Sequence, residues 1–179
     1  MQSPVWVFGY GSLMWNPEFP VLARQIARLE GYHRSFCMRS VHHRGTAEEP
    51  GLVLALDRQE GAHCDGVAFL MDDHGLEASL AALRARELVS AAYLETVQPL
   101  TLRDGRQVEA LTYVIDPDHV QYCGGLPLEE QAHIIARARG QRGPNTEYLH
   151  NTASHLAELQ LTDPELDWLA RRVRELSAA

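Results

Sequence analysis

Residues 5–15 read VWVFGYGSLMW, and this stretch decides how the fold begins. The apolar run over residues 5–10 predicts a buried strand, and the strand opens directly into Gly-Tyr-Gly-Ser-Leu at positions 9–13. Glycine has no side chain and takes backbone angles that other residues avoid, so backbone amide groups in this segment can approach a ligand closely. The pattern indicates a small anion site at the end of the first strand.

Length and charge bound the class of protein. With 179 residues, 45% of them hydrophobic, the chain is expected to form a single domain over residues 1–179. The formal charge of −8 and the lack of a long Lys/Arg cluster argue against nucleic acid or an anionic membrane as partner. No apolar run approaches the roughly 20 residues that span a bilayer, and no secretory leader pattern begins the chain. We therefore expect a cytoplasmic protein, whose oligomeric state the sequence leaves open.

Cysteines and histidines give no sign of a metal site or a disulfide framework. The three cysteines, Cys37, Cys64 and Cys123, are odd in number and far apart, which is typical of reduced, mostly buried thiols. His42 and His43 are adjacent and would point apart in an extended segment. We expect neither a metal nor a cofactor.

Strand-like segments fill the first two thirds of the chain, and helical segments follow. The expected strands cover residues 5–10, 25–38, 51–56, 66–71, 96–102 and 107–115, and the expected helices 76–88, 127–138, 145–159 and a last one begun by Asp163-Pro164. Asp104-Gly105 predicts a tight hairpin between the last two strands, because both residues tolerate a positive φ. Asn145 is expected to cap its helix. This order predicts an α+β fold with a curved or barrel-like sheet.

A glutamate lies on the apolar face of the helix expected over residues 76–88. At 100° per residue, Glu87 falls within the stripe formed by Leu76, Leu80 and Leu83, whereas Arg86 points to its flank. Burial and the negative end of the helix dipole both disfavour a charged carboxylate, so the pKa of Glu87 should be raised, as suits a general base and acid. Alternatively, the helix ends a turn earlier and Glu87 pairs with a neighbouring arginine.

Other motifs are weaker. The glycines could begin a dinucleotide fingerprint GxGxxG, but its last position is Met14, and GYGSL lacks the second glycine of a nucleophile elbow around Ser12. The segment RSVHHRG brings Arg39 and Arg44 into one loop, which either holds a carboxylate or is a solvated turn. Tyr148, in NTEYL, is compatible with a core aromatic residue whose hydroxyl is hydrogen-bonded.

Four of these segments together resemble the ChaC-type γ-glutamylcyclotransferases. They are FGYGSLMWNPEFP, the loop HHRGT, the pair Arg86-Glu87 followed shortly by Tyr93, and NTEYL, and they occur in the order found in that family. The resemblance implies a mixed β-barrel flanked by helices and a lyase that needs no cofactor. It also implies conversion of glutathione, the expected small-molecule partner, to 5-oxoproline and cysteinylglycine.

The resemblance also implies roles for particular residues. The catalytic glutamate of the family matches Glu87, and the loop that binds the γ-glutamyl group through its backbone matches Tyr10, Gly11, Ser12 and Leu13. Tyr148 matches a tyrosine that lines the same pocket. We expect Glu87 to take a proton from the substrate amine and to return it to the leaving nitrogen, and either Arg39 or Arg44 to neutralise the glycine-end carboxylate.

Two other functions remain open at this point. One is a cyclotransferase of the same fold that acts on other γ-glutamyl amines or amino acids, for which the cationic contact is unnecessary. The other is a non-catalytic module that binds a small anion at the glycine loop and uses Glu87 only structurally.

Overall fold

The computed structural model describes residues 4–88 and 91–178 and groups them into two compact units. Unit 1 comprises residues up to Arg34 together with Leu56–Val120, and unit 2 comprises Ser35–Ala55 together with the chain from Gln121 onward. The single domain expected over residues 1–179, of which 1–3, 89–90 and 179 lie outside the described part, stays a prediction.

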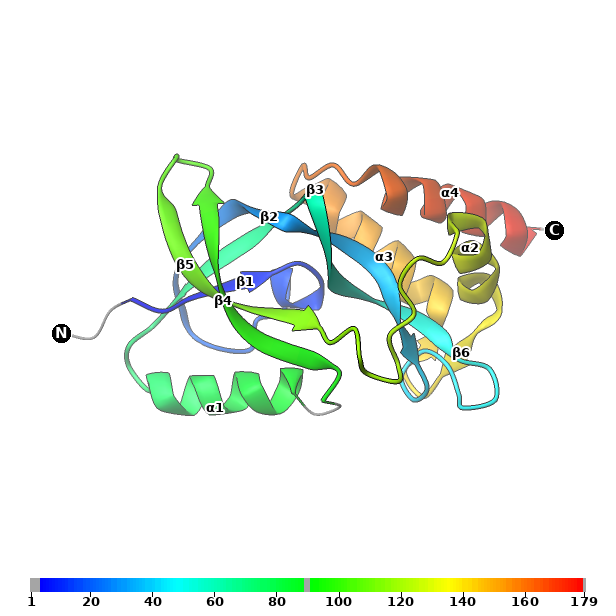
Figure 1. Ribbon diagram of the computed structural model, residues 1–179, viewed down its shortest axis with the longest axis horizontal. Coiled ribbons are helices and arrows are strands. Elements are labelled where there is room, and N and C mark those ends of the chain that lie inside the picture. The colour runs from blue at the N-terminus through cyan, green and yellow to red at the C-terminus, as the bar shows by residue number, and fades with distance from the viewer. Residues whose placement is uncertain (1–3, 89–90, 179) are drawn as a thin grey trace. The chain divides into compact units, whose positions relative to one another are not determined.

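Five strands form a closed barrel in the order β1-β3-β2-β4-β5 (Figure 1). Their bounds are β1 Trp6–Gly9, β2 Val21–Ser40, β3 Gly51–Met71, β4 Tyr93–Leu102 and β5 Gln107–Ile115. The barrel is mixed, because β1 pairs antiparallel with β3, Trp6 opposite Leu70, and parallel with β5, Trp6 opposite Ala110. The expected α+β class with a barrel-like sheet is confirmed.

The β4–β5 hairpin, drawn in green in Figure 1, forms where Asp104-Gly105 predicts it. Gly105 has a φ of 93°, and Thr101 pairs with Gln107 across the turn. Aromatic and aliphatic side chains fill the core of unit 1. Its fully buried members include Phe8, Leu29, Phe69, Leu100, Leu102 and Tyr113.

The prediction of two strands over residues 51–56 and 66–71 is wrong, because a single strand, β3, runs through both. Residues 58–61 at its middle are exposed and polar, so the hydrophobic pattern lapses although the backbone remains extended. Gly61 accommodates the bend there with a φ of 81°.

Helices dominate unit 2. They are α2 Leu128–Arg137, α3 Asn145–Glu158 and α4 Pro164–Ala178, and they pack against one another (Figure 1). The expected start of the last helix is confirmed, because Asp163 Oδ1 accepts the N–H of Leu166 at 3.1 Å. Two short strands, β6 Arg139–Gly140 and β7 Gly143–Pro144, form a hairpin between α2 and α3. In the described part of the chain, no helix is long and apolar enough to cross a membrane.

The asparagine expected to cap α3 has a different role. Asn145 is the first helical residue, and its side chain bonds the backbone of Leu52 instead of the helix's own amides. The prediction of a side-chain cap was wrong, because the buried backbone of Leu52 offers this side chain both a donor and an acceptor.

Candidate active site

The predicted site residues are divided between the two units. Unit 1 holds Glu87 and the glycine loop, Tyr10, Gly11, Ser12 and Leu13, and unit 2 holds Arg39, Arg44 and Tyr148.

The glycine loop leaves β1 and turns at once into a short 3-10 helix, η1, over Ser12–Met14. The turn is fixed by N–H donation from Met14 to Gly11 O at 2.9 Å and from Asn16 to Ser12 O at 2.9 Å. The amides of residues 11, 12 and 13 donate to no acceptor within the part of the chain that the structure describes. Three neighbouring N–H groups are thus available to a carboxylate or an oxyanion.

The two glycines of the loop have different surroundings. A Cβ on Gly9 would lie 3.1 Å from Leu13 Cβ and 3.2 Å from a ring carbon of Phe69, so Gly9 is required for close packing of the loop. A Cβ on Gly11 would meet no atom within 4 Å. Gly11 itself is buried, and the direction in which a side chain would project from it is open.

A buried arginine, Arg34, is hydrogen-bonded to the backbone of the glycine loop. The Nε of Arg34 donates to Tyr10 O at 2.7 Å, and one of its terminal nitrogens donates to Asp65 O at 2.6 Å. Arg34 is only 7% exposed, so these bonds are made where water competes little. Sequence reasoning missed this residue, because an isolated arginine within a strand carries no motif.

Glu87 is the last residue of helix α1, Leu76–Glu87. Its side chain is 15% exposed, and Leu83, one turn earlier on the same face, is buried. Burial raises the pKa of Glu87, and the charge of Arg86 lowers it in part. The helix therefore does not end a turn early, and the expected rise in pKa is found together with a pairing to Arg86 at 3.6 Å.

Arg86 joins Glu87 to the glycine loop. It donates to Ser12 Oγ at 2.8 Å and to Asn16 O at 2.6 Å, while its Nε lies 3.6 Å from Glu87 Oε1. Helical periodicity places Arg86 only on the flank of the helix. The flank faces the loop that follows β1, a relationship that helical periodicity alone does not contain.

A second polar cluster lies on the sheet near Glu87. Arg84 donates to Glu95 Oε1 at 2.9 Å, and Tyr113 donates its hydroxyl proton to the same oxygen at 2.7 Å. Burial first, and then the hydrogen bond and charge of Glu95, raise the pKa of Tyr113, with a smaller contribution from Glu87. Tyr113 therefore stays a neutral donor at physiological pH.

In unit 2, Arg44 and Tyr148 are both engaged in structural contacts. Arg44 Nη1 donates to the carbonyl oxygens of Arg142 and Pro144 at 3.0 and 3.1 Å, and it lies 3.6 Å from Glu147. Its guanidinium also lies 5.8 Å from the ring centre of Tyr148. The hydroxyl of Tyr148 accepts the N–H of Leu54 at 3.0 Å.

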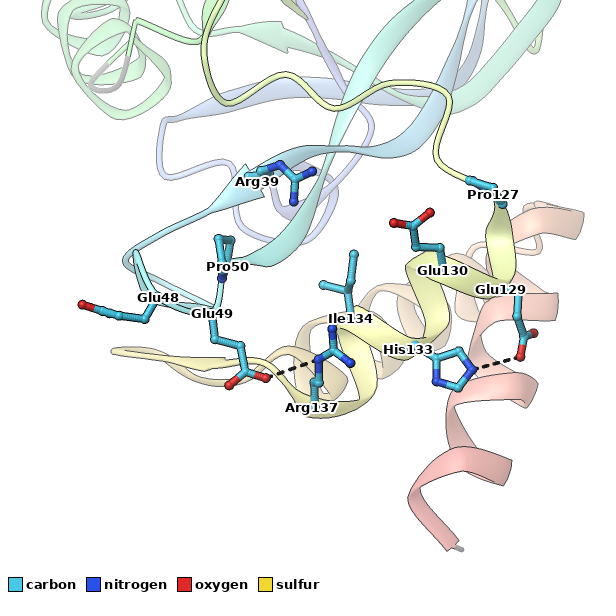
Figure 2. A pocket seen from close by; sticks show the side chains of 10 residues that line it. All are labelled: Arg39, Glu48, Glu49, Pro50, Pro127, Glu129, Glu130, His133, Ile134 and Arg137. Atoms are coloured by element: carbon cyan, nitrogen blue, oxygen red, sulfur yellow. Dashed lines mark hydrogen bonds and ion pairs between the residues drawn. The ribbon is translucent and has the colours of Figure 1, made fainter.

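Arg39 lines a groove of about 720 Å³ within unit 2, between residues 48–50 and helix α2. Figure 2 shows its guanidinium pointing toward the carboxylate of Glu130, with Ile134 below them. Neither charged group has a side-chain partner among the described residues, whereas Glu49 pairs with Arg137 at 3.3 Å on the same groove. Of the two predicted arginines, Arg39 has the uncommitted guanidinium.

Over residues 4–88 and 91–178, no cluster of three or more His, Cys, Asp or Glu side chains is placed to hold a metal ion. Cys37 and Cys64 are buried and Cys123 is half-buried.

Comparison with known proteins identifies the family to which the chain belongs. The sequence model of the ChaC-like proteins matches residues 5–176, and the chain belongs to that family.

Two relatives and one solved structure illustrate the similarity. The chain is 40% identical over 177 residues to the glutathione-specific gamma-glutamylcyclotransferase of Escherichia coli (strain K12), covering 99% of this chain and 76% of that protein. It is 36% identical over 168 residues to glutathione-specific gamma-glutamylcyclotransferase 1 of Danio rerio, covering 93% and 84%. A crystal structure of the yeast cyclotransferase specific to glutathione superposes with a TM-score of 0.86 over 97% of both chains at 24% identity, which establishes the shared fold.

Proposed function

We propose that the protein is a glutathione-specific γ-glutamylcyclotransferase, a lyase that converts glutathione to 5-oxoproline and cysteinylglycine. The observation that carries the proposal is the link from Glu87 through Arg86 to the glycine loop, which places a partly buried base beside unbonded amides. The family membership and the names of the relatives in Escherichia coli and Danio rerio support the same reaction.

The substrate supplies its own nucleophile. The α-amine of the γ-glutamyl group attacks the γ-carbonyl carbon, a five-membered ring closes, and the amide bond to the cysteine nitrogen breaks. The protein must therefore fold the substrate, remove a proton from the ammonium, stabilise an oxyanion and protonate the leaving nitrogen. No covalent bond to the protein is needed.

Glu87 is the proton carrier in this scheme. Its carboxylate takes a proton from the substrate amine, and the resulting acid gives the proton to the cysteine nitrogen as the amide bond breaks. A pKa raised by burial brings the carboxyl closer to the operating pH, which favours both steps. A carboxylate without such a shift would be a weaker base and would take the proton from the amine less readily.

The loop and the cations bind the ends of the substrate. The free amides of residues 11–13 donate to the α-carboxylate or to the developing oxyanion, beside the space that Gly11 leaves open. Arg39 neutralises the glycine-end carboxylate, since the guanidinium of Arg44 is already committed to backbone carbonyls. Tyr148 is assigned to the pocket wall by its match to the family motif. A cytoplasmic location remains part of the proposal.

The test is incubation of purified, metal-free protein with glutathione and, separately, with γ-glutamylalanine, with 5-oxoproline measured by mass spectrometry. We expect product from glutathione and little from γ-glutamylalanine. Equal or greater product from γ-glutamylalanine would assign the protein to the broader cyclotransferases, and binding without product would favour the non-catalytic module.

A further inference from the structure

We propose that Arg86 is a positioning residue of this site, which locks the catalytic carboxylate and the substrate-binding loop into one geometry. The inference rests on the proposed function and assigns to that site a residue outside the glycine loop and Glu87.

All three nitrogens of the Arg86 guanidinium are in use, each toward a different group. Nη2 donates to Ser12 Oγ at 2.8 Å, and Nη1 donates to Asn16 O at 2.6 Å and lies 3.3 Å from Glu18 Oε2. Nε lies 3.6 Å from Glu87 Oε1. The planar fork therefore spans both ends of η1 and reaches the last residue of α1.

The side chains of Arg86 and Glu87 are 24% and 15% exposed, so these contacts are partly shielded from water. A rigid guanidinium loses little freedom for each bond it makes and fixes the direction of each. Reacting groups misplaced by about 1 Å can lose on the order of a hundredfold in rate, so such a clamp has a direct effect on turnover.

Arg86 has a second effect through its charge. Arg86, on the same helix, is the charged group that acts on the pKa of Glu87. Glu87 in turn acts on Tyr113 of β5, together with Glu95 and Arg84. Glu18 lies against Arg86 on the loop side. Burial raises the pKa of Glu87, and Arg86 is the group that opposes the rise. Removing the charge should push the pKa of Glu87 higher.

Two substitutions of Arg86 distinguish the effect of its hydrogen bonds from the effect of its charge. Arg86→Lys keeps the positive charge but has a single nitrogen, which cannot reach Ser12, Asn16 and Glu87 together. Arg86→Gln removes both the fork and the charge. Arg106→Gln is the matched control, because Arg106 is an exposed arginine of the same unit paired with Asp104 at 2.9 Å in the β4–β5 turn.

The experiment measures kcat and KM for glutathione from pH 5 to 9 in wild type and in these variants. We expect kcat to fall about tenfold to a hundredfold in both Arg86 variants, in line with the cost of misplacing reacting groups. The acid limb of the kcat profile should move to higher pH in Arg86→Gln only. Arg106→Gln should match wild type in both respects.

Ser12→Ala provides a variant that keeps the arginine and disturbs no core contact, since Ser12 is exposed. In the wild-type background, Ser12→Ala should cause part of the fall in kcat seen in the Arg86 variants. Combined with Arg86→Gln in a double variant, it should lower kcat no further. Additive losses, or an unshifted acid limb with near-normal kcat in Arg86→Gln, would overturn the proposal. A general loss of folded protein would lower activity without moving the pH limb.

One readout does not depend on turnover. The carboxyl carbon of Glu87 can be titrated by NMR after selective glutamate labelling, with its signal assigned by its absence from Glu87→Gln. A higher pKa in Arg86→Gln than in wild type supports the inference even if glutathione is not the substrate, and an unchanged pKa contradicts it even if glutathione is cleaved.

Discussion

Asn145 and Leu52 exchange two hydrogen bonds across 93 positions of sequence. Asn145 Oδ1 accepts the Leu52 N–H at 2.8 Å, and its Nδ2 donates to Leu52 O at 2.8 Å. The asparagine is fully buried, and a Cβ at the neighbouring Gly51 would lie 2.8 Å from its Oδ1. Helix α3 is thus attached to strand β3 by a side chain that imitates a paired strand.

Replacing that side chain should destabilise unit 2. Asn145→Ala leaves the Leu52 amide and carbonyl buried without this partner, at about 1–3 kcal/mol for each group, so the free energy of unfolding should fall by roughly 2–6 kcal/mol. Urea denaturation measures the change. The control is Asn151→Ala, an exposed position of the same helix, which should change the stability by less than about 0.5 kcal/mol. Equal effects of the two substitutions would contradict this role.

Glu87→Gln should remove turnover without removing the fold. Glutamine keeps the shape but cannot accept the amine proton, so kcat should fall by about 10² to 10⁴, as is typical for loss of a general base. KM for glutathione should change little, because the loop amides remain. Steady-state 5-oxoproline formation and far-UV circular dichroism measure the two effects, and normal turnover would rule out Glu87 as the proton carrier.

The same substitution should change how stability depends on pH. Because burial raises the pKa of Glu87 in the folded state, the native protein binds more protons than the unfolded chain between the two pKa values. Wild-type stability should therefore fall as the pH rises through that window. Glu87→Gln lacks this loss, so it should be more stable than wild type above the window and lose that advantage below the unfolded pKa. Urea midpoints at acidic and neutral pH compare the two proteins, and an advantage largest in acid would contradict the assignment.

The two loop glycines should respond differently to alanine. Gly9→Ala forces a Cβ against Leu13 and Phe69, so it should destabilise the protein by about 1–3 kcal/mol, the usual cost of overpacking. Gly11→Ala places its methyl in open space and should leave the thermal midpoint nearly unchanged. Since that space is where the substrate is proposed to lie, Gly11→Ala should raise KM for glutathione about tenfold. A KM equal to wild type would show that the substrate does not approach Gly11.

The expectation of one loop holding both arginines is wrong, because β2 extends to Ser40 and includes Arg39, and only Arg44 lies in the loop before β3. Substituting each arginine should show which one binds the substrate and which one stabilises the fold. Arg39→Gln should raise KM for glutathione roughly tenfold, the usual size of one charge-assisted hydrogen bond, and leave KM unchanged for a γ-glutamyl amine without a carboxylate. Arg44→Gln removes the donor to Arg142 O and Pro144 O, so it should mainly lower the thermal midpoint. Selective loss of glutathione affinity in Arg44→Gln alone would reverse the assignment.

The local features of the fold could be predicted, because they are set by residues close in sequence. Asp104-Gly105 fixed the hairpin and Asp163-Pro164 the start of α4, and the apolar stripe of α1 placed Glu87 correctly. The continuous strand β3 could not be recognised, since its polar middle lacks the alternation of a half-buried strand. The burial of Glu87 could be predicted, because helical periodicity, which depends only on nearby residues, places its carboxylate on an apolar face.

The supports of the site could not be predicted in the same way. Arg34 and Arg86 act on the glycine loop from positions 24 and 74 residues away, through Tyr10 O and Ser12 Oγ. Exposed and buried arginines look alike in sequence, and Arg34 from β2 and Arg86 from α1 reach the loop only in the folded structure. The role of Asn145 was predicted wrongly for the same reason. Its side chain bonds the backbone of Leu52, far away in sequence, instead of capping its own helix.

The parallel contact between β1 and β5 also governs how the chain reaches its native state. The barrel closes only when Trp6 of β1 pairs with Ala110 of β5. Strand β1 therefore lacks one of its two neighbours until β5, the last strand of the barrel, has been synthesised. Such long-range pairing is slow to form. A chain interrupted before Gln107 would keep open strand edges on β1 and β4, and unpaired edges are templates for aggregation.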